Sequence, residues 1–328
     1  MPESTIRVAV LCGGYSAERE ISLKSGRVVF ENLPSEKFEK YLVDVRREGI
    51  FVKTSEGEVQ ATLRPFGFAA SDTFIKFDVV FNAIHGTPGE DGILQGMLDM
   101  LKVPYTTGGV LPMALTFSKA ECNAYLTKMG FRVPKGIYTT EEVDPGYVMS
   151  ELGYPVFVKP AKSGSSVGVS KVGSPEGLEA AVDLARQTDR LILIEQMIHG
   201  VEVSCGVSDV FGHIQVFEIT EIVPAGEFFD YKAKYSGQSQ EITPARIRPE
   251  VSESIKEISI EAYKLLNLHG LCRIDFIVPD SEAPVLIEIN TVPGLSEMSI
   301  LPRQAAYLGI SLDQLFSACI FSALKRNS

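Results

Sequence analysis

Two short segments near the C-terminus, LCRIDFIV at 271–278 and VLIEIN at 285–290, alternate apolar and polar residues. This period of two is typical of strands that bury one face. The residues between them, PDSEAP, favour a turn, so the pair is predicted to form an antiparallel hairpin. The rest of the chain is organised around this hairpin.

The alternation places chemically similar side chains on one face of the hairpin. Arg273 and Asp275 share a face of the first strand, and Glu288 and Asn290 share a face of the second. Two carboxylates, an amide oxygen and a guanidinium therefore converge. Hard oxygen ligands suit Mg²⁺, whose coordination is completed by water and nucleotide phosphates. The alternative is a solvated sheet face with paired charges.

Composition narrows the functional class. The 328 residues allow two or three domains, and 45% hydrophobic with 22% charged residues is typical of a soluble globular protein. A net charge of −11 argues against nucleic acid or an anionic membrane as a partner. No apolar run approaches the roughly 18 residues of a membrane span, and the N-terminus lacks the pattern of a signal peptide. Five scattered cysteines without a CxxC pair favour buried thiols in a reducing cytosol, so we expect a cytoplasmic protein.

The N-terminal part resembles an open α/β sheet. The apolar run at 6–11 predicts a buried strand, and Ser16 is a candidate N-cap that places Glu18 in the first turn of the next helix. A second buried strand at 78–84 ends in HGTPGEDG, so His85 lies where such sheets bind ligands, although a structural role is equally open. Neither standard glycine-rich phosphate motif is present, which argues against a dinucleotide oxidoreductase.

The sequence pattern changes near Gly108–Gly109, where we predict a domain boundary. Beyond a helix at 118–129, a strand at 156–159 and another at 169–172 flank a loop rich in Gly and Ser. The backbone N–H groups of such a loop can bind a polyphosphate, although a flexible turn without a ligand fits the same pattern.

The remaining segments alternate between helix and strand patterns. We expect helices at 175–186, 250–268, 301–308 and 312–326, and strands at 190–197, 201–210 and 213–223. The polar segment 224–244 is longer than an ordinary connector and is predicted to be an active-site lid. The stretch EGEVQATL at 56–63 supports no prediction.

Six motifs in this order resemble the D-alanine–D-alanine ligases of the ATP-grasp superfamily, from about residue 6 to residue 310. They are GGYSAEREISL from Gly13, HGTPGEDG from His85, SK at 118–119, VFVKPAKSGSSVGVSK from Val156, EQMIHGVEVS from Glu195, and RIDF with IEINTVPG from Arg273. The resemblance implies an α/β (α+β) fold of three domains. An N-terminal parallel-sheet domain at 1–108 would bind substrate, and domains at 109–194 and 195–328 would clamp ATP.

The resemblance also implies the reaction. ATP phosphorylates the carboxylate of one D-alanine, and the amine of a second attacks the acylphosphate through a tetrahedral intermediate. ADP, phosphate and D-alanyl-D-alanine, a peptidoglycan precursor, are the products. The family further implies a cytoplasmic homodimer that binds neither nucleic acid nor membrane.

Matching positions imply the site residues. The metal ligands would be Asp275, Glu288 and Asn290, with Glu288 bridging two Mg²⁺ ions that Mn²⁺ could replace. ATP would contact Lys119, Lys159, Ser166, Glu195, Glu202 and Lys234. The two D-alanines would contact Glu18, His85, Arg273, Gly294 and Ser299, with Arg273 and the Gly294 N–H forming an oxyanion hole. Glu18, Ser165 and Tyr235 would link the lid to the site, and Lys234 would reach the γ-phosphate and the product carboxylate.

Alternatives remain within and outside this family. Relatives that form a D-lactate ester carry another residue at the position of Tyr235, so the Lys234–Tyr235 pair favours an amine acceptor. Another carboxylate–amine ligase is the second hypothesis. A nucleotide-binding sensor without catalysis would be expected to have a damaged metal triad, whereas all three residues are present here.

Overall fold

The computed structural model describes residues 5–162, 164, 167–223, 240–280 and 283–326. The N-terminal elements are β1 (Ile6–Gly13), α1 (Arg19–Asn32), β2 (Phe38–Arg46), β3 (Gly49–Thr54), β4 (Gly57–Gln60), β5 (Thr62–Leu63), β6 (Phe66–Ala70), β7 (Thr73–Lys76), β8 (Val79–Asn82), α2 (Ile93–Leu101), α3 (Val110–Phe117) and α4 (Lys119–Lys128). The central elements are β9 (Gly136–Thr139), α5 (Pro145–Glu151), β10 (Val156–Pro160), β11 (Ser170–Val172), the 3₁₀ helix η1 (Pro175–Gly177), α6 (Leu178–Arg186) and β12 (Ile192–Gln196). The C-terminal elements are β13 (Val201–Ser208), β14 (Gln215–Val216), β15 (Thr220–Val223), β16 (Gln240–Ile242), α8 (Pro249–Leu265), β17 (Leu271–Val278), β18 (Val285–Asn290), α9 (Ile300–Tyr307) and α10 (Leu312–Arg326).

The N-terminal sheet has the order β4-β3-β2-β1-β8. Its centre is parallel as predicted, because β1 pairs in parallel with both β2 and β8. Strands β3 and β4 extend it in antiparallel fashion, and β5–β7 form a separate small sheet that was not predicted. The parallel pairing brings the ends of β1 and β8 to one edge, where Glu18 and His85 follow them.

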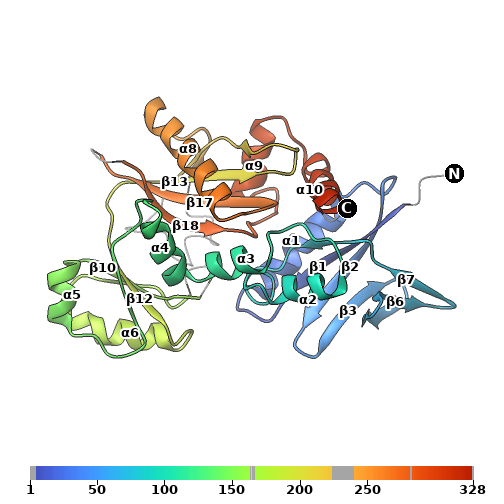
Figure 1. Cartoon of the computed structure of the whole chain (residues 1–328), viewed down its shortest axis with the longest axis horizontal. Coiled ribbons are helices and arrows are strands. Elements are labelled where there is room, and N and C mark those ends of the chain that lie inside the picture. The colour runs from blue at the N-terminus through green and yellow to red at the C-terminus, as the bar shows by residue number, and fades with distance from the viewer. Residues whose placement is uncertain (1–4, 163, 165–166, 224–239, 281–282, 327–328) are drawn as a thin grey trace.

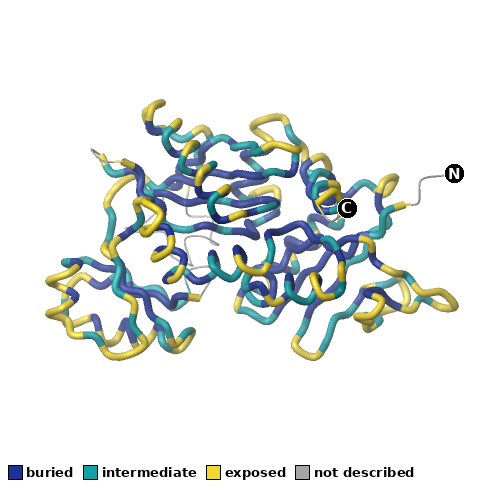
Figure 2. Tube along the Cα trace, in the orientation of Figure 1, coloured by how far each residue is buried: buried dark blue, intermediate teal, exposed yellow. Residues whose placement is uncertain are grey.

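Alternate residues of β1 enter two different cores, and Figure 2 shows how residues of the strands are buried. Val8 and Val10 pack in a core that includes Val29 of α1 and Phe316 of the C-terminal helix α10. Leu11 packs on the other side in a core that includes Leu94 of α2. Helix α10 therefore returns to the N-terminal sheet and lies beside α1 (Figure 1), so both ends of the chain complete one core.

The central sheet confirms the predicted strand–loop–strand. Its order is β11-β10-β12-β9, all antiparallel, and β10 and β11 flank the Gly/Ser loop. The predicted helix at 175–186 begins as η1 and continues as α6. Strand β12 crosses the domain boundary predicted at residue 194, and the domain division remains a prediction.

The C-terminal sheet contains the predicted hairpin. Its order is β16-β15-β13-β17-β18, and β17 pairs antiparallel with β18. A register shift between Asp275 and Phe276 was not predicted. Because of this irregularity Leu286 is buried while Ile287 is only partly buried, although strict alternation predicts the same face for Ile287 and Ile289.

Two local predictions were wrong. The strand predicted at 213–223 is divided into β14 and β15, which both pair with β13. Helix α1 begins at Arg19 with Glu18 as its N-cap, not Ser16. Ser16 instead accepts a hydrogen bond from the Glu18 N–H (3.1 Å) and donates one to the His85 carbonyl (3.0 Å). It thus joins the two loops rather than capping the helix.

No single helix within the described ranges is long and apolar enough to cross a membrane. Helices α9 and α10 pass such a test only together, with a bend of 104° between them.

Candidate active site

The polar face of the β17–β18 hairpin is the centre of the candidate site. Asp275 lies directly opposite Glu288, and Arg273 lies opposite Asn290, as the alternation predicts. Arg273 forms a two-pronged contact with Asp275, with Nε 3.0 Å from Oδ1 and Nη2 2.8 Å from Oδ2. The Asn290 amide also donates to Asp275 Oδ2 (3.0 Å). All four predicted side chains therefore share one face.

The neighbouring strand β13 extends this face. Ser204 pairs with Asp275 in the sheet, and its hydroxyl donates to Asp275 Oδ1 (2.6 Å). Glu202 lies two residues before it on the same face of the strand. Burial lowers the pKa of Arg273, but the facing carboxylates of Asp275, Glu288 and Glu202 outweigh this, so the net pKa is raised. The guanidinium is held in its charged form.

Lys119 reaches this face from the start of α4. Its Nζ lies 2.8 Å from Glu288 Oε1, although the two residues are far apart in sequence. Burial lowers the pKa of Lys119, but Glu288, Glu90 and Glu18 act in the opposite direction and the net pKa is raised. A charged ammonium thus stands beside a predicted metal ligand.

Lys159 and Glu195 form a second buried ion pair on adjacent strands of the central sheet. Asn123 of α4 donates to the other oxygen of Glu195 at 2.7 Å. Neither residue of the pair is more than 9% exposed. The structure therefore joins two residues that the sequence placed at separate parts of the nucleotide.

Glu18 is buried at the edge of the N-terminal sheet, against the Gly/Ser loop. A Cβ at Gly164 would fall 1.9 Å from Glu18 Oε2, so only a glycine allows the loop to approach this carboxylate so closely. The contact brings the N-terminal and central parts together at Glu18.

His85 is held by two serines of α1. Its Nε2 lies 3.0 Å from the Ser25 hydroxyl, and its backbone N–H donates to the Ser22 hydroxyl at 2.9 Å. The side chain is buried beside the loop that carries Glu18. His85 is therefore fixed in place near a predicted substrate contact.

Glu90 lies in the motif HGTPGEDG, but no role was predicted for it. One oxygen accepts from the Gly86 N–H (2.6 Å) and the other from the Val292 N–H (3.3 Å), so it joins an N-terminal loop to the segment after β18. Burial raises the pKa of Glu90 to about 8, and the nearby carboxylate of Glu18 adds to this effect. Glu90 thus bridges the two parts as a neutral acid at neutral pH.

Gly294, predicted for the oxyanion hole, and Ser299, predicted to bind the second D-alanine, lie close together before α9. Ser299 is the N-cap of this helix, and its hydroxyl lies 2.8 Å from that of Ser296. A Cβ at Gly294 would fall 2.7 Å from Ser299 Oγ. Gly294 therefore allows the chain to pass close to this hydroxyl.

The donor set fits a magnesium ion that nucleotide phosphates complete. No three Asp, Glu, His or Cys side chains converge on a ready-made metal cage in the part of the chain that the structure describes. Mg²⁺ is usually held by one or two carboxylates together with water and phosphates. Asp275, Glu288 and Asn290 supply two carboxylates and an amide on one face, and cationic groups now neutralise those carboxylates.

Four predicted residues, Ser165, Ser166, Lys234 and Tyr235, lie outside the described residues, as does most of the predicted lid. Sequence reasoning missed Asn123 and Ser204, which hold Glu195 and Asp275. The alternation of β13 could have placed Ser204 on the polar face, but no pattern links Asn123 to Glu195.

Comparisons with known proteins agree over nearly the whole chain. A family model described as the D-ala D-ala ligase N-terminus matches residues 7–108, and one described as the D-ala D-ala ligase C-terminus matches residues 134–321. A D-alanine–D-alanine ligase of Flavobacterium johnsoniae is 40% identical over 316 residues, which cover 95% of this chain and 98% of that protein.

Solved structures are also similar. The D-alanyl-alanine synthetase A of Vibrio cholerae has a TM-score of 0.89 at 26% identity, covering 98% of this chain and 99% of its own. The VanG D-Ala:D-Ser ligase of Enterococcus faecalis has a TM-score of 0.87 at 31% identity, covering 98% of this chain and 100% of its own.

The raised pKa of Glu90 predicts a pH dependence of stability in the absence of metal and nucleotide. A glutamate in the unfolded chain titrates at about pH 4.3, whereas folded Glu90 keeps its proton up to about pH 8. Its stabilising contribution is therefore complete below the unfolded pKa and is lost as the pH rises through the folded pKa. We expect the free energy of unfolding of Glu90→Gln, measured with urea between pH 5 and 8, to fall less steeply with pH than that of the wild type.

The difference in slope can reach about 1.4 kcal/mol per pH unit, the value for one proton. Glu253→Gln, at an exposed position of α8, is the control and should retain the wild-type slope. Equal slopes for Glu90→Gln and wild type would show that Glu90 is not protonated in the folded protein.

Proposed function

The chain belongs to the D-alanine–D-alanine ligase family, which confirms the resemblance seen in its motifs, and on this premise we propose how its residues act. It is a ligase with the ATP-grasp fold that uses ATP to join two D-alanines into D-alanyl-D-alanine for the cell wall. The residue roles and the metal that follow are our proposal. The observation that carries it is the single polar face on which Asp275, Glu288 and Asn290 meet.

We assign Asp275, Glu288 and Asn290 to two Mg²⁺ ions, which Mn²⁺ could replace, with Glu288 shared between them. When bound, such ions neutralise the charge that develops on the β- and γ-phosphates. Lys119 and Lys159 would add positive charge from the central part, together with Lys234 and the loop containing Ser166. Ser204 and Arg273 orient Asp275 through hydrogen bonds.

In the first step a carboxylate oxygen of the donor D-alanine attacks the γ-phosphorus of ATP. The bond from phosphorus to the β–γ bridging oxygen breaks, and ADP leaves with that oxygen. Glu18 would hold the ammonium group of this D-alanine, with His85 beside it. Glu195 and Glu202 would accept hydrogen bonds from the adenosine part of the nucleotide.

In the second step the free amine of the acceptor D-alanine attacks the acyl carbon. Arg273 and the Gly294 N–H would stabilise the oxyanion of the tetrahedral intermediate. Ser299 would bind the carboxylate of the acceptor. The carbon–oxygen bond to phosphate then breaks and the nitrogen loses one proton, which the departing phosphate takes up, so the products are the dipeptide and inorganic phosphate. A link from Glu18 through Ser165 to Tyr235 would exclude water, which would otherwise hydrolyse the acylphosphate.

The proposal extends to organisation and location. We propose domains at 1–108, 109–194 and 195–328, and the family match that ends at residue 108 supports the first boundary. We also propose a cytoplasmic location, where ATP is available, and no stable association with membrane or nucleic acid. Recovery of the native protein in a washed membrane fraction would contradict this location.

We expect ADP release with Mg²⁺-ATP to depend on D-alanine and to yield a dipeptide, while L-alanine gives no product. Glu288→Gln should reduce turnover by at least about 1,000-fold, because a shared ligand loses its charge. Glu253→Gln, at an exposed position on the same part of the chain, is the matched control and should keep the wild-type rate.

A near-normal rate for Glu288→Gln would contradict the metal assignment. Because a solved relative is described as a D-Ala:D-Ser ligase, D-serine and D-lactate are added as competing acceptors. An ester formed from D-lactate would contradict our interpretation of Tyr235.

Exposed apolar side chains on two neighbouring helices support the proposed homodimer. Ile93 and Met100 of α2 are 58% and 73% exposed, and Leu111 of the neighbouring α3 is 74% exposed. We expect the protein to elute as a dimer in size-exclusion chromatography with light scattering, and Leu111→Glu to weaken the dimer. Leu184→Glu, at an exposed apolar position of α6, is the control. A monomeric wild type would contradict the dimer, and a dimeric Leu111→Glu would contradict this interface.

A further inference from the structure

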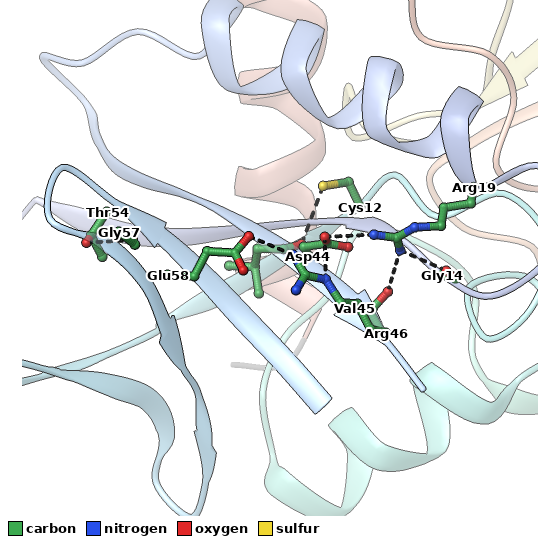
Figure 3. Close-up of polar contacts among 10 residues, drawn as sticks. Cys12, Gly14, Arg19, Asp44, Val45, Arg46, Thr54, Gly57 and Glu58 are labelled. Carbon is green, nitrogen blue, oxygen red and sulfur yellow. Dashed lines mark hydrogen bonds and ion pairs between the residues drawn. The ribbon is translucent and has the colours of Figure 1, made fainter. Parts of the chain in front are cut away.

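Residues 14–18 form the connection between β1 and α1 and include Glu18. The side chain of Arg19, the first residue of α1, extends back to Gly14 at the start of this connection (Figure 3). Its Nη1 donates to the Gly14 carbonyl at 2.9 Å and to the Val45 carbonyl at 3.1 Å. Its Nη2 donates to Asp44 Oδ2 at 2.8 Å. One guanidinium therefore ties the first residue of α1 to the start of its own connection and to the end of β2.

Asp44 is the buried anchor of this arrangement. Its side chain is 3% exposed, and the same Oδ2 also accepts from Arg46 Nε at 2.8 Å. Its other oxygen, Oδ1, is buried and has no hydrogen-bond partner among the described residues. A buried carboxylate needs opposite charge nearby, and Arg19 and Arg46 both supply it, but only Arg19 also binds the connection.

The connection packs directly against this pair. Gly13 has a φ of +84°, and a Cβ there would fall 2.2 Å from Asp44 Oδ1 and 2.5 Å from Arg19 Nη1. The adjacent Gly14 N–H donates to the Val45 carbonyl at 2.8 Å. Backbone and ion pair are therefore in contact, with no room for another side chain.

The other side of the connection faces the loop that contains His85. The Tyr15 N–H donates to the Thr87 carbonyl at 3.2 Å, and Ser16 donates to the His85 carbonyl. Glu18 is the N-cap of α1, but its side chain makes no capping hydrogen bond. The backbone that carries Glu18 is thus held on one side by the loop of His85 and on the other by Arg19, which binds Asp44.

We propose that Arg19 and Asp44 are a positioning pair that sets the carboxylate of Glu18 for the ammonium group of the donor D-alanine. This inference rests on the role proposed above for Glu18. Lysine could not replace Arg19, because a single ammonium cannot reach three acceptors in the planar arrangement that a guanidinium satisfies. Both residues would act through the position of Glu18 and not on the substrate itself.

The pair makes a selective kinetic prediction. In Arg19→Lys the apparent KM for the donor D-alanine should rise about tenfold, because displacement of the Glu18 carboxylate weakens the binding of this substrate. The constants for the acceptor D-alanine and for ATP should change by less than about twofold, since Ser299 and the lysines belong to other elements. Asp44→Asn should repeat this pattern. The two D-alanine constants are obtained from initial rates over a wide range of D-alanine concentrations.

Arg46→Lys is the matched control. Arg46 binds the same oxygen of Asp44 but otherwise contacts Glu58, away from the connection. The variant Arg46→Lys should leave the apparent KM values for the donor D-alanine, the acceptor D-alanine and ATP unchanged. The thermal midpoint of each variant is measured, and whichever of Arg19→Lys and Asp44→Asn is folded at the assay temperature decides the test.

A double mutant separates positioning from general damage. In a Glu18→Gln background, Arg19→Lys should add no further increase in the donor constant. Equal shifts in Arg19→Lys and Arg46→Lys, or additive effects with Glu18→Gln, would overturn the pair. If the apparent KM for the donor D-alanine rises in Glu18→Gln but not in Arg19→Lys, the positioning pair is overturned while the proposed role of Glu18 stands. An unchanged constant in Glu18→Gln would overturn the proposed role of Glu18 itself.

Discussion

The contact between Arg273 and Asp275 is the interaction on which the rest of the site depends. Asp275 is nearly buried, and a carboxylate there needs opposite charge and hydrogen bonds. Arg273 supplies the positive charge and two hydrogen bonds, and Ser204 and Asn290 each donate one further hydrogen bond to Asp275. The opposing strand then places Glu288 beside it, where Lys119 plays the same part. Two carboxylates are thereby kept together on one face of the hairpin, each beside a cationic side chain.

This arrangement requires contributions from the whole chain. The carboxylates lie on the C-terminal sheet, Lys119 lies at the start of α4, and Glu18 and Glu90 come from loops of the N-terminal sheet. Glu90 joins an N-terminal loop to the segment after β18 through the backbone N–H groups of Gly86 and Val292. Helix α10 reinforces the connection by packing on the N-terminal sheet. A ligase must hold ATP and two amino acids at once, and here side chains from the C-terminal sheet, α4 and the N-terminal loops contribute to one candidate site.

The sequence predicted the parts whose cause is local. The alternation in 271–278 and 285–290 was sufficient to place Arg273, Asp275, Glu288 and Asn290 on one face. Alternation cannot reveal where a strand loses register. The sequence therefore did not predict that Leu286, and not Ile287, is the buried residue at the register shift. Likewise, no local pattern shows that Arg19 reaches back to Asp44 or that α10 completes the N-terminal core, because these contacts join distant segments. The small sheet β5–β7 was missed because its short strands lack clear alternation.

Counting the divalent ions that the protein binds together with a non-hydrolysable ATP analogue tests most directly whether the hairpin face is the metal site. With protein in excess, so that all of the analogue is bound, manganese titration followed by electron paramagnetic resonance should give two tightly bound ions per molecule of analogue, as in other two-metal sites. Asp275→Asn should bind fewer ions while remaining folded. Two ions bound equally tightly by that variant would contradict the assignment and place the metals elsewhere in the protein.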